Sequence, residues 1–155
     1  MADKMISILY IDDELNNLQS FMANFRLRYN IHIAISGEEA KNILKNNPEI
    51  EIIITDQRMP NMTGVEFLES IIDEFPNPIR MLLTGYADMS AVVDAVNKGK
   101  IFHYMSKPWN EEEIIKVVEV AHELYSKKIQ EKQFTENVVT VNSQLEFLLR
   151  QKLLS

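Results

Sequence analysis

The sequence predicts an α/β fold: a doubly wound parallel sheet of five strands in the order 2-1-3-4-5, with a long C-terminal helical extension. Three observations predict it. Five apolar runs of strand length recur within residues 5–106, segments of helical spacing separate them, and neither glycine nor proline follows Pro108. Apolar runs with little alternation are typical of strands covered on both faces, as in a parallel sheet between two layers of helices.

The elements follow in chain order. The five predicted strands are MISILYI (5–11), IHIAIS (31–36), EIIIT (51–55), IRMLLT (79–84) and IFHYMS (101–106). The segments between them carry apolar stripes at helical spacing: Leu15, Leu18, Phe21, Met22 and Phe25 in the first, Val65, Leu68, Ile71, Ile72 and Phe75 in the third, and Val92, Val93 and Val96 in the fourth.

Start and stop signals support the helices. Three pairs have the spacing of a capping box or an N-cap with its partner: Ser36 with Glu39, Thr63 with Glu66, and Asn110 with Glu113. Pro48 and Gly99 stand where the second and fourth helices should end. The pattern is therefore strand, helix, strand, repeated through about residue 124.

Polar side chains follow four of the five predicted strands. They are Asp12 and Asp13 after the first, Asp56 after the third, Thr84 at the end of the fourth, and Ser106 and Lys107 at the end of the fifth. Any one of them is more typical of a cap or a turn than of a functional site. However, the carboxyl ends of parallel strands share one edge, where such folds bind ligands. Together the residues therefore predict a site.

The charges of this cluster indicate its chemistry. Two like charges about 4 Å apart repel by roughly 4 kcal/mol at an effective dielectric near 20, so three carboxylates need cations nearby. Lys107 supplies one positive charge, and oxygen ligands favour Mg²⁺ over zinc for the remainder. We expect Asp12 and Asp13 to hold the metal and Asp56 to accept a phosphoryl group as an acyl phosphate. Lys107 and Thr84 would then bind phosphoryl oxygens.

Four motifs resemble the receiver domains of two-component response regulators, which have a CheY-like, flavodoxin-like fold. They are YIDDE (10–14), TDQRMPNMTG (55–64), LLTGYAD (82–88) and YMSKPW (104–109), and the likeness extends over residues 5 to about 124. The resemblance implies that a sensor histidine kinase or a phosphotransfer protein phosphorylates Asp56. It implies a stoichiometric phosphoacceptor rather than an enzyme, although one that assists its own phosphotransfer and dephosphorylation.

The same resemblance assigns roles to further residues. It makes Asp13 a direct Mg²⁺ ligand, Asp12 a ligand acting largely through water, and the backbone carbonyl of Arg58 another ligand. Thr84 and Tyr104 resemble the switch pair of the family, and Lys107 resembles its lysine followed by a cis peptide bond, here to Pro108. Because Tyr104 lies on the fifth strand, we expect the changing surface to be formed by the fourth helix, the fifth strand and the fifth helix.

Composition excludes several classes. The chain has no cysteine, so disulfides, thiol nucleophiles and cysteine-ligated zinc are excluded. Its net charge is −7, and the acidic balance lies in residues 1–124, which argues against direct binding of nucleic acid by this segment. The sequence contains neither a signal-peptide pattern nor an apolar run long enough to span a membrane. We therefore expect a soluble, cytoplasmic protein.

The predicted division is a receiver domain at residues 1–124 and a helical extension at residues 125–155. Heptad positions 117, 120, 124, 127, 131, 134, 138, 141, 145 and 148 hold Val, Val, Leu, Lys, Glu, Phe, Val, Val, Leu and Leu. This pattern favours a parallel coiled coil that forms a homodimer, and the face of the fourth helix, fifth strand and fifth helix is a second candidate for dimerisation. Short polar and β-branched residues weaken helix propensity at 135–143. Alternatively, the tail folds back on its domain or begins an output region near residue 134.

Two other functions stay open. One is an aspartate-dependent phosphohydrolase, in which the nucleophile and the acid, two residues apart, would be Asp12 and Glu14. The other is an unphosphorylated dimerisation scaffold. A small phosphodonor with Mg²⁺ distinguishes all three functions, because only a signalling phosphoacceptor retains one phosphoryl group on Asp56.

Overall fold

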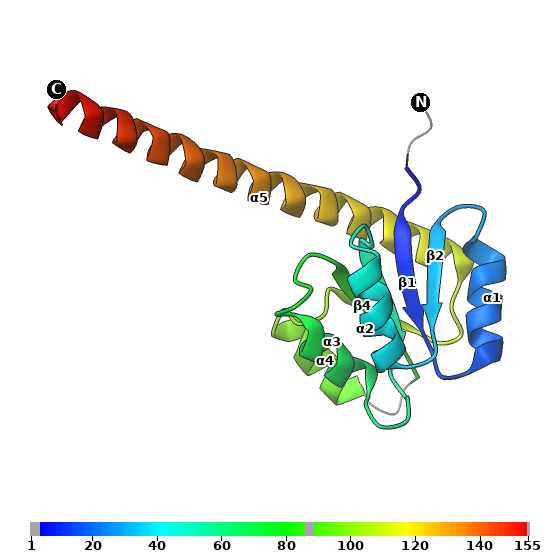
Figure 1. Ribbon diagram of the computed structural model, residues 1–155. Coiled ribbons are helices and arrows are strands. Elements are labelled where there is room, and N and C mark those ends of the chain that lie inside the picture. The colour runs from blue at the N-terminus through cyan, green and yellow to red at the C-terminus, as the bar shows by residue number, and fades with distance from the viewer. Residues whose placement is uncertain (1–3, 86–88, 155) are drawn as a thin grey trace.

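The computed structural model describes residues 4–85 and 89–154, and its strands and helices alternate along the chain (Figure 1). In order, the elements are β1 (Ser7–Ile11), α1 (Leu15–Phe25), β2 (Asn30–Ala34), α2 (Gly37–Asn46), β3 (Ile52–Asp56), α3 (Gly64–Ile71), β4 (Ile79–Thr84), α4 (Met89–Asn97), β5 (His103–Ser106) and α5 (Glu111–Leu154). The strands pair in parallel in the order β2-β1-β3-β4-β5. This order confirms the predicted fold.

Helices cover both faces of the sheet. Helices α1 and α5 pack on one face, where the buried side chains include Phe21, Phe25, Ile114 and Val118. Helices α2, α3 and α4 pack on the other. Since both faces are covered, β1 and β3 are buried along their whole length, which is why their sequences show no alternation.

The three predicted N-cap residues cap their helices with hydrogen bonds in the structure. Side-chain oxygens of Ser36, Thr63 and Asn110 accept from the backbone N–H three residues later, at 3.2, 3.1 and 3.2 Å. Each satisfies one of the N–H groups that the first turn of a helix leaves without a partner. Helix α4 ends at Asn97, and Gly99 follows with φ of 72°, a left-handed conformation that glycine adopts without strain.

Two residues of the predicted apolar stripes lie outside the core. Leu15 is 57% exposed and Val93 is 39% exposed, so these two predictions were wrong. Leu15 is the first residue of α1, at the edge of the sheet where the strands end. Val93 follows the fully buried Val92, and one residue rotates the side chain by about 100° around the helix, out of the interface.

Helix α5 begins on the sheet and continues well beyond it. Ile114, Val118 and Ala121 are buried against the sheet. At the next residue, His122 Nδ1 lies 2.6 Å from Glu51 Oε1, and nearly two turns later the Lys128 ammonium donates to the carbonyl of Pro76. These contacts attach α5 to the end of the sheet opposite the acidic site.

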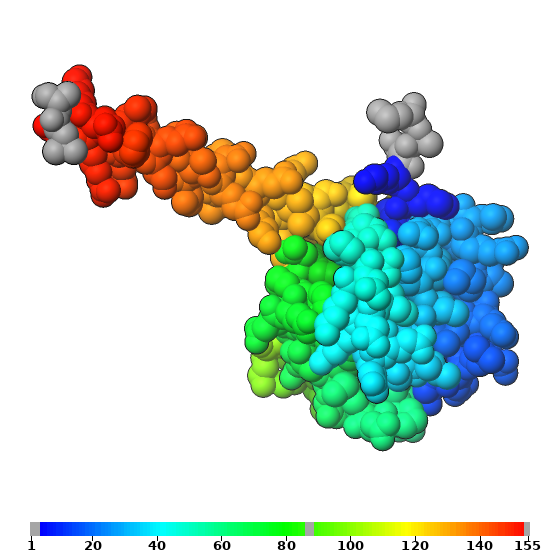
Figure 2. Space-filling model, viewed as in Figure 1, coloured from blue at the N-terminus to red at the C-terminus, as the bar shows by residue number. Residues whose placement is uncertain are grey.

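Past these contacts, α5 projects away from the body of the protein (Figures 1 and 2). Residues 131–153 are all exposed, so the extension does not fold back on the domain. The helix also runs unbroken through residues 135–143, where propensity is weak. Thr135 and Thr140 each donate a hydroxyl hydrogen bond of 3.0 Å to the carbonyl four residues earlier, which satisfies these polar groups within the helix.

Among residues 4–85 and 89–154, no helix is both long and apolar enough to cross a membrane. The division of the chain at residues 124 and 125 stays a prediction, because α5 passes through this point without a break.

Candidate functional site

The strand ends bring the predicted site residues together at one edge of the sheet. Asp12 follows β1, Asp56 ends β3, Thr84 ends β4, and Lys107 follows β5. Lys107 Nζ lies 2.7 Å from Asp56 Oδ1 and 3.5 Å from Asp12 Oδ2. Strand β2, at the far side of the sheet from β5, ends in Ala34 and contributes no charged group.

Three carboxylates form the centre of the site. One oxygen from each of Asp12, Asp13 and Asp56 lies within 4.8 Å of the other two. Asp12 and Asp56 are buried, while Asp13 is partly exposed. A set of carboxylate oxygens that opens to solvent on one side suits a hard cation such as Mg²⁺, which retains several water ligands. The donor set of the site therefore fits the predicted metal.

Burial and charge both act on the proton affinities here. Burial raises the pKa of Asp56 above its ordinary value, and the hydrogen bond from Lys107 only partly offsets this effect. Burial alone would lower the pKa of Lys107, but the hydrogen bonds and charges of Asp56 and Asp12 outweigh it, so that the pKa of Lys107 is raised. Lys107 is therefore a stable cation at neutral pH, held against the two buried acids.

Asp12 is held by donors that the sequence reasoning missed. Its Oδ2 accepts from the Tyr10 hydroxyl at 2.9 Å and from the Asn17 amide at 3.1 Å, and its Oδ1 accepts from the backbone N–H of Glu14 at 3.0 Å. The Tyr10 ring stacks on Phe21 with centroids 4.2 Å apart. Burial and the neighbouring Asp12 raise the pKa of Tyr10, so its hydroxyl remains a donor.

The loop after β3 is fixed by its own backbone. The N–H of Gln57 donates to the carbonyl of Leu83, and the N–H of Gly64 donates to the carbonyl of Gln57. The side-chain oxygen of Gln57 accepts from the N–H of Val65 at 3.0 Å, inside the protein. A Cβ at Gly64 would collide with the carbonyl of Asp56, so only glycine allows this close approach.

Thr84 and Gly85 form the wall of the site on β4. The Thr84 hydroxyl is buried and donates to the carbonyl of Gly85 at 2.7 Å. The backbone N–H of Lys107 donates to the carbonyl of Thr84 at 3.0 Å, which couples the ends of β4 and β5. A Cβ placed at Gly85 would meet no protein atom among the described residues within 4 Å.

The remaining predicted residues lie around this centre. Arg58 is exposed in the loop after β3, and the peptide bond between Lys107 and Pro108 is cis. Tyr104 lies on β5, half-buried against the core on the side of α3 and α4. Residues 86–88 of the LLTGYAD motif lie outside the described residues.

Comparison with known proteins decides the family. The sequence profile of the response regulator receiver domain matches residues 8–119. The chain belongs to this family. It is 32% identical to the hydrogenase transcriptional regulatory protein HoxA of Cupriavidus necator over 123 residues, covering 79% of this chain and 25% of HoxA. The chain thus spans about a quarter of the length of this relative.

Solved structures of other proteins agree with the fold. A response regulator receiver domain protein from Clostridium thermocellum has a TM-score of 0.73 and 28% identity, over 81% of this chain and 98% of that one. The structure described as adenylate cyclase from Rhodopirellula baltica has a TM-score of 0.81 and 26% identity, over 84% and 96%. Receiver domains of response regulators are phosphorylated by histidine kinases and bind Mg²⁺ in an acidic pocket. The predicted family and fold are confirmed.

Proposed function

We propose that this receiver domain accepts a phosphoryl group on Asp56 from the phosphohistidine of a sensor kinase or phosphotransfer protein. The observation that carries the proposal is the 2.7 Å contact between Asp56 Oδ1 and Lys107 Nζ inside a cluster of three carboxylates. The buried position of Asp56 on the central strand β3 and the partial exposure of the neighbouring Asp13 support it.

The transfer is an exchange of one bond for another. A carboxylate oxygen of Asp56 forms a new bond to phosphorus while the bond from phosphorus to the histidine nitrogen breaks, and the released imidazole takes up a proton. Lys107 neutralises one oxygen of the transferred group. Asp12, Asp13, Asp56 and the carbonyl of Arg58 would hold Mg²⁺, which neutralises further phosphoryl charge when bound.

Thr84 and Tyr104 are the proposed switch. A phosphoryl oxygen is a stronger acceptor than the Gly85 carbonyl that the Thr84 hydroxyl now uses, so the hydroxyl should rotate toward it. The space that Thr84 leaves would admit the ring of the half-buried Tyr104. The surface of α4, β5 and α5 would then change and alter contacts with an output or a partner.

The proposed reaction is stoichiometric, one phosphoryl group per chain, and the domain is not a turnover enzyme. It takes place in the cytoplasm, where the kinases draw on ATP. HoxA is named as a transcriptional regulator, and this chain spans about a quarter of its length. Control of transcription by a protein that contains this domain is therefore proposed only from that likeness. The acidic receiver domain at residues 1–124 would not itself bind nucleic acid.

Mass spectrometry of the intact chain after incubation with acetyl phosphate and Mg²⁺ tests the proposal. We expect one added phosphoryl group, mapped to Asp56 and absent in Asp56→Asn. Asp73→Asn, which removes an exposed acid, is the matched control and should label normally. Labelling of Asp56→Asn would contradict the assignment. Continued turnover of phosphodonor would favour the phosphohydrolase, and no labelling would favour the scaffold.

A further inference from the structure

Helix α5 carries an apolar stripe that has no partner among the described residues. Its members are between 38% and 70% exposed, far more than ordinary core side chains. They are Val120, Leu124, Phe134, Val138, Val141, Leu145 and Leu148. The stripe runs over about 42 Å of helix at a rise of 1.5 Å per residue.

The stripe follows a heptad spacing. Its positions alternate steps of three and four residues, with Lys127 and Glu131 at the two places that complete the series. Such spacing matches a two-helix seam with left-handed supercoiling. The seam begins at Val120, because Val117, the first predicted heptad position, is already half-buried against the sheet.

The stripe and the receiver occupy opposite sides of α5. Ile114, Val118, Ala121 and Tyr125 face the sheet. At 100° per residue, the mean direction of the stripe lies about 150° away from the mean direction of these residues. A second helix can therefore lie along the stripe of one chain without meeting the receiver domain of that chain.

We propose that α5 pairs through Val120–Leu148 with the same segment of a second copy of this chain, parallel and in register. The exposed parts of the seven stripe side chains amount to roughly 650 Å² per chain, so a pair can bury up to roughly 1,300 Å² before flanking residues are counted, within the range of stable interfaces. This proposal does not depend on phosphorylation of Asp56.

The two charged positions select the parallel arrangement. In a parallel, in-register pair, Lys127 shares a layer with Lys127 of the other copy and Glu131 shares the next layer with Glu131, so each lysine lies one layer from a glutamate of the other copy. All seven apolar layers then meet apolar layers. In a fully overlapped antiparallel pair, Lys127 would face Val141 and Glu131 would face Val138, which buries charge against apolar side chains. The pattern thus favours the parallel, in-register arrangement over the fully overlapped antiparallel one, in which only five layers would be apolar on both sides.

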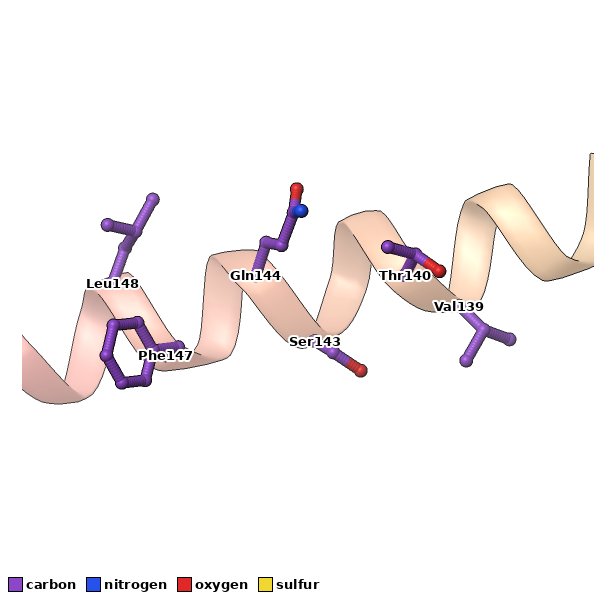
Figure 3. Close-up of a pocket in the computed structure, with 6 residues that line it drawn as sticks. All are labelled: Val139, Thr140, Ser143, Gln144, Phe147 and Leu148. Atoms are coloured by element: carbon purple, nitrogen blue, oxygen red, sulfur yellow. The ribbon is translucent and has the colours of Figure 1, made fainter.

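The face of the extension that points away from the stripe offers a matched control. Val139 and Phe147 line a shallow hollow with Thr140, Ser143, Gln144 and Leu148, and Figure 3 shows Val139 and Leu148 projecting from opposite sides of the helix. Val138 and Val139 are adjacent valines of the same exposed helix, but only Val138 belongs to the stripe.

Sedimentation equilibrium of the full chain tests the pairing. We expect a dimer in the wild type, a dimer dissociation constant at least about 100-fold higher in Val138→Asp, and a change of less than about threefold in Val139→Asp. Asp56 labelling by acetyl phosphate should be the same in both variants, which shows that the receiver is folded. A monomeric wild type, or equal effects of the two substitutions, would overturn the proposal.

Orientation is tested by cross-linking, which the absence of cysteine in the chain makes unambiguous. Leu148→Cys should form a disulfide-linked dimer with itself, whereas mixed Val120→Cys and Leu148→Cys chains should not cross-link to each other. The opposite result would establish an antiparallel pair and refute the proposed register. Lys127→Glu alone should weaken the dimer, and adding Glu131→Lys should restore it. Failure of the double variant to recover would refute the ionic layers.

Discussion

The Asp13→Asn variant, which removes one charge, should be more stable than wild type when no metal is bound. When Mg²⁺ is bound, the variant should be less stable than wild type. Two carboxylate charges 4.8 Å apart repel by about 3.5 kcal/mol at an effective dielectric near 20 and by about 0.9 kcal/mol in water. Asp13 is partly exposed and Lys107 offsets part of the repulsion. We therefore expect Asp13→Asn to raise the free energy of unfolding by about 1–2 kcal/mol in EDTA.

Magnesium should reverse this order. A ligand that binds only the folded state at about 100 times its dissociation constant adds about 2.7 kcal/mol. Asp13→Asn loses one carboxylate of the metal site, so it should gain much less from Mg²⁺ than wild type does.

Urea unfolding in EDTA and in MgCl₂ measures both effects, with Glu49→Gln, an exposed acid away from the site, as the control for net charge. A lower stability of Asp13→Asn in EDTA, or an equal gain from Mg²⁺ in both proteins, would refute the electrostatic reasoning.

Three further predictions concern single groups in the site. Tyr10→Phe removes one donor to the buried Asp12 and should lower the free energy of unfolding by about 1–2 kcal/mol in urea titrations, whereas Tyr29→Phe, in the same core cluster, should cost less. Gly64→Ala must displace the Asp56 carbonyl or Leu82, and should cost about 1–3 kcal/mol by the same measurement; no loss would contradict the tight approach. Burial raises the pKa of Asp56, and only its carboxylate form is nucleophilic. The labelling rate should therefore fall as the pH is lowered, with the midpoint of the fall above pH 3.8, the ordinary pKa of the group. A midpoint at or below pH 3.8 would count against a raised pKa.

The position of the site could be predicted because it depends on topology alone. Once the apolar runs are strands of a parallel sheet, their C-terminal ends share one edge. Asp12, Asp56 and Lys107 must then lie near one another, whatever the details of packing. Local signals sufficed for the helix starts as well, because an N-cap and its partner are only three residues apart.

The side chains that hold the site residues in place could not be predicted, because their contacts join residues that no local sequence pattern connects. Tyr10 lies within an apolar strand and resembles any core aromatic, so its hydroxyl bond to Asp12 has no sequence signal. His122 and Glu51 pair across 71 residues. Gln57 follows Asp56 as an ordinary loop residue, although its amide oxygen holds the start of α3. The exposure of Leu15 was likewise invisible, because helical spacing does not show where the sheet ends.

The hydrogen bond of Thr84 limits how strongly phosphorylation can act through this residue alone. Its present bond to the Gly85 carbonyl joins two neutral groups and contributes about 1 kcal/mol, and a bond to a charged phosphoryl oxygen contributes about twice as much. The difference of about 1 kcal/mol shifts the Thr84 rotamer population only about fivefold, whereas a complete switch requires about 5.5 kcal/mol. The remainder must come from Lys107, which already lies 2.7 Å from Asp56, and from the burial of the half-exposed Tyr104 ring. The proposed switch would therefore need Thr84, Lys107 and Tyr104, on β4 and β5, to act together, and none of the three residues would suffice alone.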